Sequence, residues 1–175
     1  MKNIPKPKQG EYPEYFEKYY SNLPADANLL ALLTQSNMDT IDVVTSVDEE
    51  TLQFRYAEGK WSIREIIQHL MDSERVFAYR AMRIARGDKS ENPGYDENEY
   101  AANSFADDRN IMDMVREFSL LRASTIELFK SLNAEALQQI GFANGYKVTA
   151  AAIGYAIAAH EMHHLKVIEQ KYLPN

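Results

Sequence analysis

Four long segments of the chain carry apolar residues at three- and four-residue spacing, and this period constrains the fold more than any other feature. An α-helix turns once in 3.6 residues, so this spacing places an apolar stripe along one face of each segment. It predicts helices over about residues 26–46, 62–86, 107–132 and 149–173. No strand-like alternation persists along the chain. We therefore expect an all-α protein, a four-helix bundle with short additional helices.

Local signals mark where the second helix begins and ends. Ser62 followed by Glu65 is a capping box, in which both side chains accept hydrogen bonds from backbone amides that the helix leaves free. Gly87 is a typical residue to follow a helix. The segment before the first helix, about residues 1–24, is rich in proline and aromatic residues and is expected to lie across the bundle as a short helix.

The connections between the predicted helices differ in length. Residues 87–105 form a long connection without an apolar pattern of its own, and such loops in compact domains often cover functional sites. We expect its stretch from Tyr95 to Tyr100 to cover a substrate, although packing is the better expectation for Tyr95 alone. The last helix opens at Thr149 after a tight turn at residues 143–146, which contains Asn-Gly.

Length and charge narrow the organisation and the partners. With 175 residues, 45% of them hydrophobic, the chain is expected to form one domain over residues 1–175, with 1–24 as an extension packed on the bundle. The formal net charge of -7 disfavours nucleic acid, because phosphate binding needs clustered Lys and Arg. No segment is long and apolar enough to cross a bilayer, so we expect a cytoplasmic protein with a small-molecule substrate and no membrane partner.

The last predicted helix carries the string HEMHH at residues 160–164, which matches the H-E-x-x-H pattern of zinc proteases. His160 and His164 lie about 40° apart on a helical wheel, on the apolar face, so both are predicted to point inward. A shared metal ion would satisfy a nitrogen of each ring. Glu161 and His163 lie to either side of this pair and are candidate catalytic acid–base groups.

A metal ion needs at least a third ligand. H-E-x-x-H proteases take theirs downstream, but only 11 residues follow His164 and none is a histidine, so a zincin-like peptidase is the least favoured interpretation. The remaining histidine is His69, on the second predicted helix. We predict that His69, His160 and His164 hold one divalent ion. A di-iron site is disfavoured because the second Glu-x-x-His motif is missing.

The chain has no cysteine, so imidazole and carboxylate groups must provide the ligands, and any reacting thiol must come from outside. A polar strip on the second helix lies within about 40° of His69 and includes Glu65, Ser73 and Arg80. For Glu65 and Arg80 a solvated helix flank is an equally good interpretation. Asp72, like Glu161 and His163, is a candidate to close the coordination or to move protons.

With these residues in view, the chain resembles the DinB-like superfamily of metal-binding four-helix bundles. The resemblance covers most of the chain and rests on the stretches IPKPKQGEYPEYFEKY, GKWSIREIIQHLMDSERVFAYRAMRIARGD, PGYDENEYAANS and AAHEMHHLKVIEQKYL. The family's three-histidine site would map onto His69, His160 and His164. The resemblance implies one divalent ion, with zinc and nickel the first candidates, and a homodimer.

The resemblance also implies a metal-dependent S-transferase, which joins a low-molecular-weight thiol to an electrophile, or a hydrolase. In either enzyme Glu161 or His163 would assist as a base, and Trp61 would pack at the start of the second helix. The alternative is a non-catalytic interaction module, in which the ion only ties the second helix to the fourth.

Overall fold

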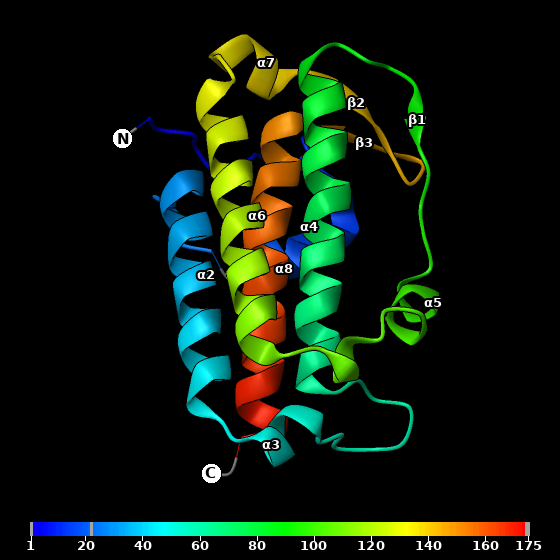
Figure 1. The fold of residues 1–175 in the computed structure, drawn as a ribbon. Helices are drawn as coiled ribbons and strands as arrows, with labels where there is room; N and C mark the ends of the chain where they lie inside the picture. Colours follow the sequence, from blue (N-terminus) through cyan, green and yellow to red (C-terminus); the bar gives the residue numbers. More distant parts are fainter. Residues whose placement is uncertain (1, 22, 174–175) are drawn as a thin grey trace.

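The structure is a computed structural model that describes residues 2–21 and 23–173, so residues 1 and 22 of the predicted extension lie outside the described part. Four long helices form a bundle, as predicted (Figure 1). They are α2 (Leu29–Ser46), α4 (Ile63–Ala85), α6 (Ile111–Ser131) and α8 (Ala150–Lys171). The sequence prediction placed the four starts one to four residues too early. None of the described helices is long and apolar enough to span a bilayer.

The helices pack in an order that differs from their order in the chain. α2 and α4 each pack against both α6 and α8, which places α2 and α4, the first two long helices, on a diagonal. α4 and α6 run in the same direction, and α2 and α8 run in the opposite one (Figure 1). The chain must therefore return along the outside of the bundle between α4 and α6, and this requirement explains the length of that connection.

Short helices decorate the bundle, also as predicted. They are η1 (Glu14–Phe16), α1 (Glu17–Tyr20), α3 (Glu49–Gln53), α5 (Glu97–Ala102), η2 (Ala106–Asp108) and α7 (Ala134–Gln138). The capping box at the start of α4 is present in full, with the Ser62 hydroxyl and the Glu65 carboxylate each accepting a backbone hydrogen bond.

A small sheet is a feature of the backbone that the sequence analysis did not predict. β2 (Ile140–Ala143) and β3 (Tyr146–Thr149) form an antiparallel hairpin, and β1 (Glu91–Asn92) pairs with β2 in parallel. The turn predicted at residues 143–146 closes this hairpin, with positive φ at both Asn144 and Gly145. Strands of two to four residues are too short to show alternation, although Asn-Gly is the usual signal of a hairpin.

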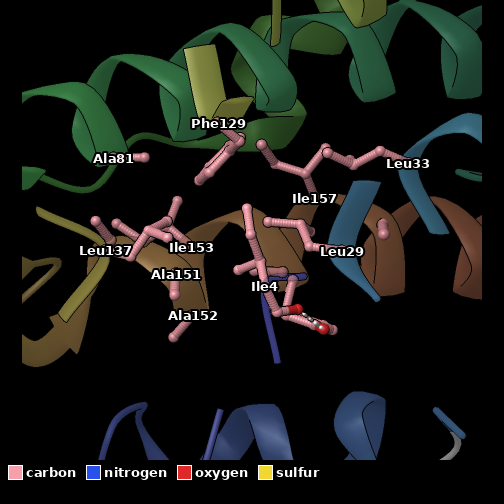
Figure 2. Close-up of a cluster of buried hydrophobic side chains, with 14 of the residues drawn as sticks. Ile4, Leu29, Leu33, Ala81, Phe129, Leu137, Ala151, Ala152, Ile153 and Ile157 are labelled. Carbon is pink, nitrogen blue, oxygen red and sulfur yellow. Dashed lines mark hydrogen bonds between the residues drawn. The ribbon is translucent and has the colours of Figure 1, made fainter. Parts of the chain in front are cut away.

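The buried apolar side chains form two clusters along the bundle. The first lies toward α7 and includes Ile4, which reaches from the amino-terminal segment to Leu29 (Figure 2). The second lies toward α3 and includes Phe118 and Ile168. α8 approaches its neighbours closely because it is rich in small residues. A Cβ atom on Gly154 would lie 2.6 Å from Leu29 and 2.7 Å from Phe129.

A buried polar layer separates the two clusters and takes one side chain from each long helix. Arg122 of α6 forms ion pairs of 2.8 Å with Glu74 of α4 and with Glu161 of α8. Ser36 of α2 donates a hydrogen bond to Glu161, and the Arg122 guanidinium donates to the Leu33 carbonyl at 2.6 Å. The three charged side chains are at most 3% exposed. The layer therefore joins all four helices at one height.

We expect Arg122→Met to lower the free energy of unfolding by about 3–5 kcal/mol, because it leaves two carboxylates buried without a cation. The matched control is Arg116→Met on the same helix, where the side chain is exposed and the effect should stay within about 0.5 kcal/mol. Urea denaturation of the three proteins measures both values. Equal stabilities of the two variants would contradict the structural role of the layer.

Candidate metal centre

The structure brings together the three histidines that the sequence singled out. His69 projects from α4, and His160 and His164 project one turn apart from α8. The Nε2 atom of His160 lies 3.1 Å from the Nε2 atoms of both His69 and His164. One potential ligand atom from each of the three histidines lies within 4.8 Å of the other two, and among the described residues no other group of three His, Cys, Asp or Glu side chains converges in this way.

Hydrogen bonds alone do not account for this arrangement. A neutral imidazole nitrogen carries either one proton or one lone pair, so the His160 Nε2 atom can form a hydrogen bond with only one of its two neighbours. A cation is a better partner for the three nitrogens. With metal–nitrogen distances of about 2.0–2.1 Å, nitrogens 3.1 Å apart subtend an angle of roughly 100° at the ion, between octahedral and tetrahedral values. Both nitrogen pairs that include His160 therefore have the spacing of ligands on one divalent ion, and the three side chains together form a candidate site for it.

Burial keeps these imidazoles neutral. It lowers the pKa of His69 to about 4. Burial, together with the neighbouring His69 and His163 rings, lowers the pKa of His164 to about 3, and burial also holds the pKa of His160 well below its usual value. Their lone pairs are thus free at neutral pH, as metal binding requires.

Aromatic rings surround the triad. The Trp61 ring lies 4.7 Å from the His69 ring and 6.4 Å from the His164 ring, measured between centroids. The Trp61 carbonyl accepts a hydrogen bond of 2.6 Å from the Tyr172 hydroxyl. Trp61 therefore packs at the start of α4, as expected, and also restricts the orientation of two of the three histidines.

A cavity of about 240 Å³ lies beside the triad, and His69 and His160 form part of its wall. Its remaining lining comes from α4, α8, the amino-terminal segment, the connection after α4 and the β2–β3 hairpin. Most of these side chains are aromatic or aliphatic: Pro13, Tyr15, Phe16, Tyr19, Phe77, Tyr95, Ala143, Val148, Ile153 and Ala156. Polar groups come from Ser73, Arg80, Glu97 and Asn144. Such a mixture suits a small organic molecule.

The connection after α4 and the amino-terminal segment both line the cavity, although they lie outside the long helices. The connection after α4 lines the cavity through Gly94, Tyr95 and Glu97, in line with its predicted covering role. Tyr95 is more than a packing residue, because its hydroxyl lies 2.8 Å from that of Ser73 inside the cavity. The amino-terminal segment, expected only to pack across the bundle, also forms a wall of the cavity. Its run of closely spaced aromatic residues was the available signal.

The two candidate catalytic bases lie elsewhere. Glu161 is 1% exposed and turns into the bundle, where Arg122 and Ser36 hold its Oε2 atom. His163 is exposed, and its ring packs edge-on against Tyr19 at 5.2 Å. Neither side chain lines the cavity. A base role for either stays a prediction.

The residues of the polar strip beside His69 lie in different surroundings. Glu65 belongs to the helix cap and pairs with Arg55. Asp72 accepts a hydrogen bond from Gln68 and pairs with Arg75 at 3.3 Å, and it is not part of the converging group. Ser73 and Arg80, in contrast, are buried and line the cavity, so the solvated flank is wrong for Arg80.

Comparisons with a family model, a relative and a solved structure agree with one another. Residues 32–168 match the family model described as the DinB superfamily. A relative from Oceanobacillus iheyensis named "Putative metal-dependent hydrolase OB0413" is 28% identical over 133 residues, which are 73% of this chain and 74% of the relative. A solved structure described as "YfiT from Bacillus subtilis is a probable metal-dependent hydrolase with an unusual four-helix bundle topology" superposes with a TM-score of 0.75. The superposition covers 94% of this chain and 90% of the YfiT chain. At 16% sequence identity it shows a similarity of fold.

The metal-free protein should lose stability as the pH falls from about 6.5 to about 4. The folded-state pKa of His69 lies near 4 and the unfolded value near 6.5, so in this range the unfolded chain binds the proton and the folded chain does not. Each such histidine adds up to about 1.4 kcal/mol per pH unit to the slope. Urea denaturation in chelator at several pH values measures it. His69→Asn should give a shallower slope, and identical slopes would contradict the burial of a neutral His69.

Proposed function

Because the chain belongs to the DinB superfamily, we propose that it is a metal-dependent enzyme, in the first place a hydrolase, that acts on a small molecule in the cavity beside His69 and His160. One observation carries the proposal: three imidazoles converge, and two of them, His69 and His160, lie on the wall of a cavity that has room for a substrate. The names of the Oceanobacillus relative and of YfiT point in the same direction.

The histidines would hold one divalent ion, with zinc and nickel as the first candidates. When bound, such an ion supplies Lewis acidity, which polarises an electrophile and lowers the pKa of water or of a thiol. His69 and His160 belong to the triad and also line the cavity, so a molecule in the cavity would lie next to the histidines that hold the ion.

Side chains of the cavity can orient the substrate. Burial raises the pKa of Tyr95, so its phenol keeps its proton at neutral pH and can donate a hydrogen bond. Its hydroxyl and that of Ser73 lie together at 2.8 Å on one side of the cavity. The aromatic walls exclude water from the remaining surface, which strengthens these polar contacts.

A thiol transferase is the second candidate within the same proposal. The chain contains no cysteine, so a thiol that reacts in this cavity has to be a second substrate of low molecular weight. The two candidates differ in whether water or the thiol attacks the electrophile, and direct assays separate them.

The metal content of protein purified without chelator or affinity metal tests the site. We expect about one equivalent of a divalent ion in the wild type and its loss in His69→Ala and His160→Ala, because each removes one of three ligands. His163→Ala is the matched control on α8, since His163 is exposed and outside the triad. Mass spectrometry gives the metal content. An ion that survives both triad substitutions would refute the site.

Activity separates the enzyme from a metal-stabilised interaction module. We expect the zinc or nickel form to hydrolyse members of an ester and amide panel, or to consume an epoxide only when a small thiol is present. His160→Ala should lower the rate by a factor of 100 or more, on the order of the loss of a metal ligand or an oriented charge. Bound metal without turnover in either panel would favour the interaction module instead.

A further inference from the structure

The cavity is elongated along α4. His69, Ser73, Phe77 and Arg80 all line it, and on a helical wheel they fall within about 80° of one another. At a rise of 1.5 Å per residue, the Cα atom of Arg80 lies about 16 Å beyond that of His69 along the helix. The cavity therefore extends from the histidine triad toward a guanidinium group.

Arg80 is one of three arginines in the described residues that are more than nine-tenths buried, with Arg64 and Arg122. The other two have carboxylate partners: Arg64 contacts both oxygens of Glu49 at 2.6 and 2.7 Å, and Arg122 binds the two glutamates of the polar layer. Arg80 differs. No ion pair in residues 2–21 and 23–173 includes it.

The contacts of Arg80 place no carboxylate within ion-pair distance of its charge, and the exposed Glu91 raises its pKa less than burial lowers it. Its guanidinium donates to the Pro93 carbonyl and lies over the Phe77 ring at 6.0 Å. Burial lowers the pKa of Arg80, whereas the hydrogen bonds that Arg64 donates to Glu49 raise the pKa of Arg64. A carbonyl and a ring do not offset the cost of burying a full charge. Among the described residues that line the cavity, the one carboxylate is that of Glu97, which is exposed.

From these observations we infer that Arg80 binds an anionic group of the ligand, and that the cavity takes an elongated small molecule with a carboxylate or phosphate at one end. A guanidinium presents five N–H donors in a planar fork that matches these anions. Phe16, Phe77 and Tyr95 then contact an apolar or aromatic middle section, and the reacting group lies at the histidine end. That this molecule is a substrate rests on the proposed function; the anion site itself does not.

A matched pair of probes tests the anion site: 4-phenylbutyrate, which carries a carboxylate, and 4-phenylbutanol, which has the same apolar body without the charge. Isothermal titration calorimetry at low salt measures both. The wild type should bind the carboxylate about 10–100-fold more tightly than the alcohol, the range expected for a charged hydrogen-bonded pair. Arg80→Met should abolish this preference, and Arg80→Lys should keep part of it. The control Glu97→Gln, which removes the rim carboxylate, should keep or increase it.

The same measurement in His69→Ala separates the anion site from the metal site, because a carboxylate can also bind a metal ion directly. Preference for 4-phenylbutyrate in this variant supports Arg80 even if no metal binds, and its loss there assigns the preference to the triad. Equal binding of the two probes by the wild type, no detectable binding of the carboxylate, or an unchanged preference in Arg80→Met would each overturn the inference.

Thermal unfolding provides an independent readout. Because Arg80 is buried without an ion-pair partner among the described residues, Arg80→Met should leave the melting temperature of the ligand-free protein unchanged or raise it, as substitutions of groups kept for function often do. Arg122→Met should lower it. A melting temperature of Arg80→Met as low as that of Arg122→Met would show that Arg80 is a structural residue and would also overturn the inference.

Discussion

The ion pairs of Arg122 set the geometry on which the rest of the bundle depends. A charge that is this deeply buried must stay paired, so Glu74 of α4 and Glu161 of α8 are held at the height of one guanidinium on α6. Glu161 follows His160 directly in the chain, and Glu74 lies five residues after His69. The pairs thus fix how far α4 and α8 can slide along each other. This restraint holds three imidazole nitrogens from two helices within 4.8 Å.

The two apolar clusters enclose this polar layer and exclude water from it, which makes charge in the layer costly to bury. Large side chains such as Phe129 fill the space toward α7, while α8 contributes mainly alanine and glycine and so lies close to both α2 and α4. Close packing of α8 brings His160 and His164 near α4, and it also excludes the water that would otherwise stabilise their protonated forms. The same low-dielectric environment explains why the histidines stay neutral and why the buried arginines need anions.

Buried charge therefore serves two purposes in this protein. The charge of Arg122 is satisfied within the chain and ties helices together, whereas the charge of Arg80 lacks a carboxylate from the described residues and lies on a cavity wall. Natural proteins retain such uncompensated groups where a ligand uses them, at some loss of stability. Around Arg80 and the triad, the cavity is closed by segments outside the four long helices: the amino-terminal segment, the connection after α4 and the β2–β3 hairpin.

The sequence by itself determined the four helices, the cap at Ser62 and the inward direction of His160 and His164, because all three depend on local spacing: the apolar period, the capping box and the inward face of a helix. Only the tertiary structure decided the partners of these faces. Spacing placed Glu161 beside the histidines but could not show that Arg122 would bind it, since α6 lies far from α8 in the chain. Likewise, the sequence left open whether Arg80 belongs to the polar strip beside His69 or to a solvated helix flank. The outcome depends on segments up to 80 residues away in the chain, such as the one that contributes His160, and long-range packing is not encoded in a local period.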